Sequence, residues 1–403
     1  MDRYKSFFRG IAYAGYCIVF LFAVYTFEKS IPDQIYVKAG EAIDYQFQVP
    51  VTMEIQEDSS PVAKSTNNAN VRQSYIVTCR LFGIFPVKDI EVVLVDGDAV
   101  YAGGMPIGLY VKTSGVLVIG TSEVERPDGS EAAPAENILK AGDYILSVNG
   151  EKVAEKEDLQ RLVQQNGAEK EILKINRKGE EVEVGGTPVQ NKNGTYMLGA
   201  WVRDDLAGIG TLTYYKEDGT YGALGHAVSD GDVGERIQMS EGYVYNAQII
   251  GVKKGQKGSP GELSGMIRYQ SADCLGTIEE NTDIGIYGKL DGNIAALPRG
   301  DYYNICYKQD IKQGPATIIC GFTGEKKEYA IEIESLDYSG REANKGILFR
   351  VTDEQLLDMT GGIVQGMSGS PILQDGKIIG AVTHVFVSDS SMGYGIFIEN
   401  MVE

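Results

Sequence analysis

Histidine, cysteine and tryptophan are scarce in this chain, and their scarcity excludes several kinds of chemistry. The 403 residues include two histidines, one tryptophan and five cysteines. No Cys-x-x-Cys pair occurs and no histidine lies near a cysteine in the sequence, so no metal site is expected. The cysteines are too few and too scattered for a disulfide framework. We expect buried free thiols and no cofactor; a single bridge stays open among Cys79, Cys274, Cys306 and Cys320.

Basic residues are outnumbered by acidic ones. The chain has 37 Lys and Arg against 56 Asp and Glu, which gives a net charge of −19. Nucleic-acid binding needs a basic face, so a nucleic-acid partner is not expected. The glycine- and lysine-rich residues 251–261 lack the Gly-x-x-x-x-Gly-Lys-Ser/Thr spacing of a phosphate-binding loop. A nucleotide site is therefore not predicted either.

Residues 10–27 form an uncharged, apolar run of eighteen positions that follows Arg3, Lys5 and Arg9. This is near the minimum length of a transmembrane helix, and the basic flank predicts a cytoplasmic N-terminus with the rest of the chain outside. A cleaved signal peptide is the alternative, but no clear small-x-small cleavage site follows the run. We expect residues 1–32 to be a cytoplasmic tail and a membrane anchor.

The most informative motif is Gly-Met-Ser-Gly-Ser-Pro at residues 366–371, which places Ser368 between Gly366 and Gly369. A serine nucleophile needs a sharp backbone turn, an accessible hydroxyl and backbone N–H groups that face the developing oxyanion. Gly-x-Ser-Gly-x-Pro is the pattern of trypsin-like serine peptidases. The motif predicts Ser368 as the nucleophile and the amides of Gly366 and Ser368 as the oxyanion hole, although a structural glycine turn is an open alternative.

A serine nucleophile needs a base of near-neutral pKa, and an imidazole is the usual one. His226 has small residues on both sides, which would let other groups approach its ring. His384 lies in an apolar, strand-like run after the serine turn, where alternation would place it with Val382 and Phe386. This pattern favours His226 as the base and predicts that His384 is a packed strand residue.

The third member of such a site is a carboxylate that orients the imidazole. Asp353 ends an apolar, strand-like run fifteen positions before Ser368. Asp230 and Asp232 are rivals because they lie close to His226 in the sequence, although such near neighbours seldom reach the correct ring nitrogen. With Asp353 the chain order is His, Asp, Ser, which is the order of trypsin-like double barrels but is weak evidence by itself.

Several segments together resemble the SpoIVB family of stage IV sporulation serine peptidases. They are Gly-Ala-Leu-Gly-His at 222–226, Val-Thr-Asp at 351–353, Thr-Gly-Gly-Ile-Val-Gln-Gly-Met-Ser-Gly-Ser-Pro at 360–371, Gly-Ala-Val-Thr-His-Val-Phe-Val at 380–387 and Gly-Tyr-Gly-Ile at 393–396. The resemblance covers the chain from its anchor to its end, loosely in the first third. It assigns the catalytic roles to His226, Asp353 and Ser368.

The resemblance also implies a role in endospore formation. The enzyme would act between the forespore and mother-cell membranes, where it would cleave a membrane-bound regulator of an intramembrane metalloprotease and so trigger activation of a late sigma factor. It would first cleave itself near the N-terminus and release its catalytic part from the anchor. The exposed, polar residues 58–73 are the expected place for that cut.

Residues 105–184 resemble a PDZ domain. Pro-Ile-Gly-Leu-Tyr-Val at 106–111 resembles the carboxylate-binding loop and its strand, and an amphipathic helix is expected over residues 156–165. An extended peptide would add a strand there, with its carboxylate on backbone N–H groups near Ile107, Gly108 and Leu109. Alternatively, this sheet edge packs on the peptidase domain and binds no ligand.

The sequence therefore predicts a mainly β protein in four parts. These are the anchor at 1–32, a small β-rich module at 33–100, an α+β PDZ domain at 101–190, and a trypsin-like double β-barrel at 191–403, where many short strands follow one another. The predicted function is a membrane-anchored serine endopeptidase. The alternative is a catalytically silent, membrane-tethered PDZ adaptor.

Overall fold

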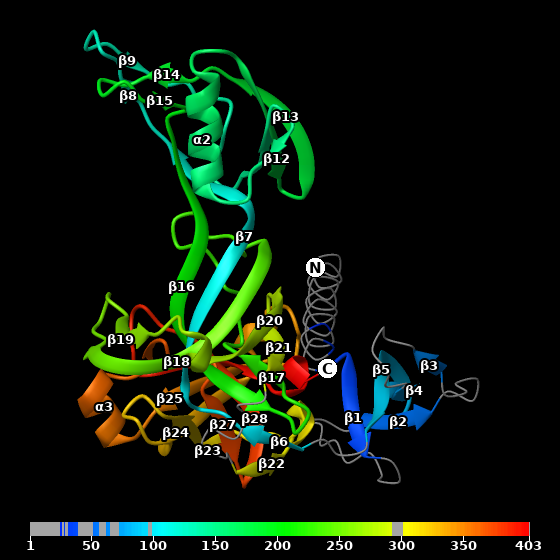
Figure 1. Ribbon diagram of the computed structural model, residues 1–403. Helices are drawn as coiled ribbons and strands as arrows, with labels where there is room; N and C mark the ends of the chain where they lie inside the picture. Colours follow the sequence, from blue (N-terminus) through cyan, green and yellow to red (C-terminus); the bar gives the residue numbers. More distant parts are fainter. Residues whose placement is uncertain are drawn as a thin grey trace, which may run out of the picture.

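The computed structural model describes residues 25, 28, 31–38, 51–55, 62–64, 72–95, 99–291 and 301–402 (Figure 1). The predicted anchor at 10–27 lies outside the described residues except for Tyr25. Within the described ranges, no helix is both long and apolar enough to cross a membrane. The fold is mainly β, as predicted, with a small N-terminal sheet, a PDZ domain and two barrels.

The N-terminal module is a five-stranded sheet. Its strands are β1 (Gln34–Lys38), β2 (Val51–Ile55), β3 (Val62–Lys64), β4 (Arg72–Leu81) and β5 (Phe85–Val95). Alternating apolar residues of β4 and β5, such as Val77, Ile90 and Val92, form a small core. β3 lies inside the predicted exposed loop 58–73 and pairs with β4, so that segment is in part a strand.

The PDZ domain packs one helix against a twisted sheet. Its short strands are β8 (Val124–Glu125), β9 (Glu131–Ala132), β11 (Glu151–Lys152), β14 (Val189–Gln190) and β15 (Tyr196–Met197). The main sheet contains β10 (Tyr144–Val148), β12 (Glu171–Arg177) and β13 (Glu180–Gly186). The predicted helix is confirmed as α2 (Lys156–Asn166), which buries Leu159, Leu162 and Val163 on one face. It begins with a capping box between Glu155 and Asp158.

Two long strands connect the PDZ domain with the rest of the molecule (Figure 1). They are β7 (Pro106–Thr121) and β16 (Ala200–Tyr215), which pair with each other almost throughout their lengths. The lower half of β7 belongs to the first barrel, and its upper half, from Val116 onward, contributes to the PDZ core. That core extends to Leu198, so the PDZ fold begins later and ends later than the predicted 101–190.

The predicted peptide-binding residues Ile107, Gly108 and Leu109 are therefore in the wrong domain. Each of them pairs with β16 on one side and with β18 on the other. With both edges occupied, these residues have no free N–H or C=O groups for an added strand. The error arose because β7 continues straight from the barrel into the PDZ domain, whereas the prediction required a separate PDZ strand at 106–111.

The first barrel is closed by six strands. In order around the ring they are β7, β16, β17 (Thr220–Ala223), β21 (Gly285–Leu290), β20 (Cys274–Thr282) and β18 (Met239–Lys253). β18 continues beyond the ring into a hairpin with β19 (Gly261–Ile267). The short strands β6 (Ala99–Ala102) and β22 (Tyr302–Asn304) extend the sheet beside β16. Buried apolar side chains such as Leu109, Tyr221 and Ile286 fill this barrel.

The second barrel also has six strands, which confirms the predicted pair of barrels. They are β23 (Gly314–Cys320), β24 (Lys327–Leu336), β25 (Ile347–Val351), β29 (Met392–Phe397), β28 (Lys377–Val385) and β27 (Pro371–Gln374). The helices α3 (Glu354–Thr360) and α4 (Glu399–Val402) follow β25 and β29. A shared core joins the barrels, and the Tyr214 hydroxyl of β16 donates to the Met401 carbonyl. The four described cysteines are free thiols.

Candidate active site

The first barrel holds the turn that carries Ser368. The turn runs from β26 (Val364–Gln365) to β27, with Gly366 and Gly369 at positive φ. From β16, the Thr211 hydroxyl donates to the Gly366 carbonyl at 2.8 Å and the Thr211 amide donates to the Ser368 carbonyl at 3.0 Å. A Cβ at Gly369 would lie 2.1 Å from the Thr211 carbonyl oxygen, so glycine is required there. These contacts place Ser368 where the two barrels meet.

The Ser368 hydroxyl points toward the second barrel. It is half-buried and donates to the Thr383 carbonyl of β28 at 2.8 Å. Thr383 is in turn held by its own hydroxyl, which donates to the Asn344 carbonyl at 2.6 Å. The hydroxyl is therefore oriented by a neutral acceptor and could rotate to another acceptor without breaking an ion pair.

The backbone amides of the turn fall into two groups. Those of Met367, Gly369 and Ser370 donate to carbonyls of the fold at 3.1, 2.7 and 3.0 Å. In the part of the chain that the structure describes, no acceptor takes the amides of Gly366 and Ser368. Two unpaired N–H groups beside a serine hydroxyl are the donors that an oxyanion needs. They are also the two amides predicted from the sequence.

His226 approaches the same place from the first barrel. It follows β17 through a tight turn in which Leu224 and Gly225 have positive φ. A Cβ at Gly225 would lie 2.8 Å from the Thr383 side chain, so the residue before His226 and the Ser368 hydroxyl both lie against Thr383 of β28. The Nδ1 atom of His226 lies 2.8 Å from the Ala227 carbonyl oxygen. Because a carbonyl can only accept, Nδ1 carries the proton and Nε2 can accept one.

Burial lowers the pKa of His226 below its usual range, and the hydrogen bond to Ala227 opposes this shift. The ring is therefore neutral at pH 7, which is the state that a general base requires.

His384 lies beside His226, which the sequence did not indicate. The two ring centroids are 5.3 Å apart, with the planes tilted by 41°. A bulge in the pairing of β28 with β29 falls between Val382 and His384 and interrupts the predicted alternation. The Nδ1 atom of His384 is buried and has no hydrogen-bond partner among the described residues. A packed strand histidine was predicted, but not its contact with the candidate base.

Asp353 is placed differently from the other two predicted triad residues. Its carboxylate caps helix α3 by accepting from the Leu356 amide at 2.9 Å, and it also accepts from the Ala330 amide at 3.4 Å. It follows β25, and β29 lies between β25 and the β28 strand that carries His384. The structure therefore places the turns that carry His226 and Ser368 against the same strand, β28, whereas the contacts of the Asp353 carboxylate are with the amides of Leu356 and Ala330.

The rival carboxylates have other partners. Asp230 is fully buried, pairs with Arg203 of β16, and accepts from the amides of Asp232 and Val233. Asp232 contacts the same arginine at 3.2 Å. These contacts tie the segment after His226 to the strand that leads from the PDZ domain. They give both carboxylates a structural role.

The two histidines make stability depend on pH. Burial, His226 and Lys345 lower the pKa of His384 to about 4, and Glu342 opposes the shift. A histidine whose pKa is lower in the folded state binds fewer protons there than in the unfolded chain. We expect the free energy of unfolding to fall as the pH drops from about 6.5 toward 4. Urea midpoints measured across this range should depend less on pH in His384→Phe. An equal slope in the variant would contradict the expectation.

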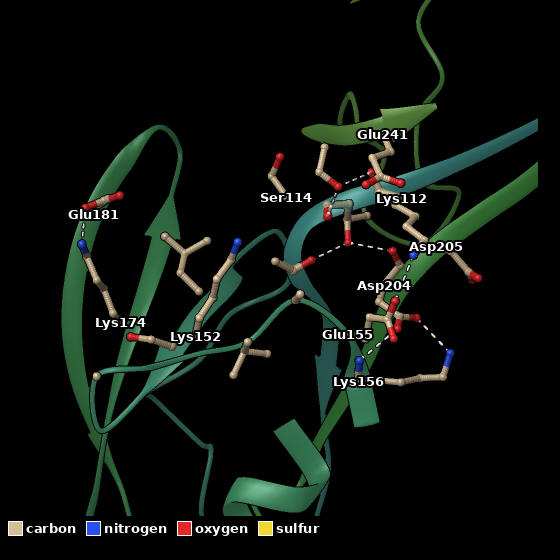
Figure 2. Close-up of a pocket in the computed structure, with 18 of the residues that line it drawn as sticks. Lys112, Ser114, Lys152, Glu155, Lys156, Lys174, Glu181, Asp204, Asp205 and Glu241 are labelled. Carbon is tan, nitrogen blue, oxygen red and sulfur yellow. Dashed lines mark hydrogen bonds and ion pairs between the residues drawn. The ribbon is translucent and has the colours of Figure 1, made fainter. Parts of the chain in front are cut away.

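Another hollow lies away from this site. It has a volume of about 1030 Å³ and lies between the PDZ sheet and the strands that lead to the barrel. Figure 2 shows that several of its charged side chains pair with one another, as Lys112 does with Glu155 and Lys156 does with Asp204. Neither His226 nor Ser368 lines it. It is a polar cleft between domains rather than part of the candidate active site.

Two regions of the chain match known protein families. The profile of the family "SpoIVB peptidase S55" matches residues 194–402, more than half of the chain, and a PDZ domain profile matches residues 127–177. No significant match was found among curated proteins.

Two solved structures show limited similarity. The PDZ domain of an SdrC-like protein from Listeria monocytogenes shares 18% identity over 22% of this chain and 87% of its own, with a TM-score of 0.19. The HtrA-type protease AlgW, solved with a decapeptide, shares 15% identity over 49% of this chain, with a TM-score of 0.27. The match spans half of that protease.

Proposed function

Because the chain belongs to the SpoIVB peptidase S55 family of serine peptidases, we propose that it is an endopeptidase whose nucleophile is Ser368 and whose base is His226. One observation carries this proposal. The Ser368 hydroxyl lies in a turn with two unpaired amides and contacts Thr383, which Gly225, the residue before His226, also approaches; Nε2 of His226 is free to accept a proton. Labelling with a serine-directed fluorophosphonate probe tests it.

The reaction follows from these groups. The Ser368 hydroxyl turns from the Thr383 carbonyl, gives its proton to Nε2 of His226 and attacks the scissile carbonyl carbon. The resulting oxyanion accepts hydrogen bonds from the amides of Gly366 and Ser368. The carbon–nitrogen bond then breaks as the imidazolium returns the proton to the leaving amine. Water, deprotonated by the same histidine, hydrolyses the acyl-enzyme.

Asp353 is proposed as the orienting carboxylate on the resemblance alone. Asparagine caps a helix about as well as aspartate, so Asp353→Asn keeps the cap of α3 while it removes the negative charge and the weak 3.4 Å bond from the Ala330 amide. For a triad member, kcat should fall by roughly 10⁴ with little change in the free energy of unfolding. Asp353→Ala should also lose about 1 kcal/mol of stability with the cap. Wild-type turnover in Asp353→Asn would leave capping as its only role.

Strand β16 gives the PDZ domain a free strand edge for a peptide partner. Over residues 200–205, β16 pairs with β7 on one side, and no described strand pairs with its other side. Helix α2 begins next to this edge, because the Lys156 amide donates to the Asp204 carboxylate at 2.9 Å. Trp201 is 63% exposed there. An extended peptide that adds to β16 beside α2 would gain main-chain hydrogen bonds.

The proposed setting is endospore formation. The chain would be a single-pass membrane protein with a cytoplasmic N-terminus and its catalytic part in the space between forespore and mother cell. Its substrate would be a membrane-bound regulator of an intramembrane metalloprotease, and the cleavage would trigger late sigma-factor activation. The basic flank and apolar run at residues 1–27 support the topology, and the family supports the setting.

Self-cleavage should release the PDZ and peptidase domains together. The cut is expected within residues 58–73 but outside β3, because a paired strand cannot extend into a cleft. The wild-type chain, made without other proteases, should yield a soluble form whose new N-terminus lies in this segment. Ser368→Ala should stay attached to the membrane. A new N-terminus beyond residue 105, or undiminished release of Ser368→Ala, would contradict this prediction.

A further inference from the structure

A second hollow, of about 560 Å³, lies next to the nucleophile turn. Gly366 forms one end of it, and its walls come from β16 and β19 of the first barrel. The residues on which the argument depends are Gly208 and Ile209 of β16, Gly265 and Ile267 of β19, Tyr269 and Gly366. The hollow therefore reaches the residue that carries one of the two unpaired amides, Gly366.

An open strand edge borders this hollow. On one side, β19 pairs with β18 along most of its length. On the other side it pairs with β26, but only at Gly261 and Glu262. The chain then leaves the ladder at Gly366, which has a φ of +98°. Within the described ranges, no strand takes the edge at residues 263–267. The ladder that β26 begins is therefore interrupted at the nucleophile turn.

The lining of the hollow suits a polypeptide with uncharged side chains. Ile209, Ile267 and Tyr269 provide apolar surface, and Glu262 is the one charged residue among the described residues that line it. At Gly208 a Cβ would meet no atom within 4 Å, so there is open space above the backbone of β16. An extended chain placed there could pair with β19 and continue toward Gly366 and Ser368.

We propose that this hollow is a substrate subsite, in which an extended, uncharged segment next to the scissile bond adds as a strand to residues 263–267 of β19. The assignment rests on the proposed peptidase function. Its main-chain pairing would hold the reacting carbonyl beside the amides of Gly366 and Ser368. The first barrel thus contributes to substrate recognition through the β18–β19 hairpin as well as contributing the base.

The test measures how an unfolded polypeptide protects Ser368 from a small probe. Fluorophosphonate labelling of the full-length protein is followed with and without reduced, carboxymethylated casein. Casein should slow labelling of the wild type by competition. A Cβ at Gly208 would meet no atom within 4 Å, so we expect Gly208→Val to fold and to be labelled at the wild-type rate when casein is absent. It should lose at least about tenfold of the protection that casein gives. The matched control Gly120→Val, a β7 strand glycine that also faces open space, should behave as the wild type.

Absence of labelling in Gly208→Val even without casein would indicate that this variant is misfolded. A second variant keeps the test decisive in that case. Tyr269 is 53% exposed, so Tyr269→Ala should fold, and it should weaken the casein effect severalfold. Its control is Tyr302→Ala, at a tyrosine of β22 that is 61% exposed and does not line the hollow. The subsite would be overturned if casein did not slow labelling of the wild type. It would also be overturned if casein slowed labelling of Gly208→Val and Tyr269→Ala as much as it slows labelling of the wild type. Absence of labelling in the wild type would instead overturn the peptidase function.

Discussion

Replacing Ser368 by alanine is expected to lower kcat/KM by about 10⁴–10⁶ and to abolish fluorophosphonate labelling. The side chain makes a single hydrogen bond, to the Thr383 carbonyl. Its loss should therefore change the free energy of unfolding by only about 1 kcal/mol. The effect on turnover is much larger because the hydroxyl is the group that forms the acyl-enzyme. Initial rates on an unfolded protein substrate, together with urea unfolding, separate the two effects.

Ser240→Ala is the matched control for this variant. Ser240 lies on β18, and its hydroxyl also donates to backbone carbonyls, those of Lys112 and Thr113. It lines the cleft between the PDZ domain and the barrel, away from the nucleophile turn. Turnover should stay at the wild-type level. If Ser368→Ala retained more than about a hundredth of the wild-type kcat/KM, the hydroxyl would not be the nucleophile.

Replacing His226 by alanine should have an effect of similar size, and the double variant with Ser368→Ala should be little worse than either single one. The two residues carry out one proton transfer and one attack, so their losses do not add. In wild-type protein, the acid limb of the kcat/KM profile should lie below pH 6.5, because burial lowers the pKa of His226. Rates measured from about pH 4 to pH 8 give this limb.

His384 provides the comparison for His226. Its ring adjoins that of His226, but its lowered pKa and its buried, unpaired Nδ1 describe a packed side chain. We expect His384→Phe, which keeps the packing, to retain turnover to within about tenfold while changing stability. The assignment of the base would be wrong if a folded His384→Phe were inactive and His226→Ala were active.

The parts of the site that could be predicted from the sequence are those fixed by local backbone geometry. Gly366 and Gly369 are needed because the turn requires positive φ and lies against Thr211. Such backbone requirements produce a short glycine motif that can be recognised in the sequence. The helix at 156–166 could also be predicted, because its buried residues repeat with the helical period. In both cases the signal lies within a few consecutive residues.

The parts that could not be predicted depend on strand pairing over long sequence distances. Whether Ile107 and Gly108 form a free edge is decided by β16 and β18, about a hundred or more positions further along the chain. His384 adjoins His226 and follows a bulge in the pairing of β28 with β29, and neither feature leaves a signal in the sequence. The capping position of Asp353 was hidden because an aspartate before a helix and one in a triad look alike in a sequence.

The most direct test of the central claim is to identify by mass spectrometry the residue of the wild-type chain that a fluorophosphonate modifies. The account predicts one adduct, on Ser368, formed faster above the pKa of His226 than below it and absent in a folded His226→Ala. An adduct on another serine, or no adduct on a folded protein, would contradict it and would leave the alternative of a catalytically silent PDZ adaptor.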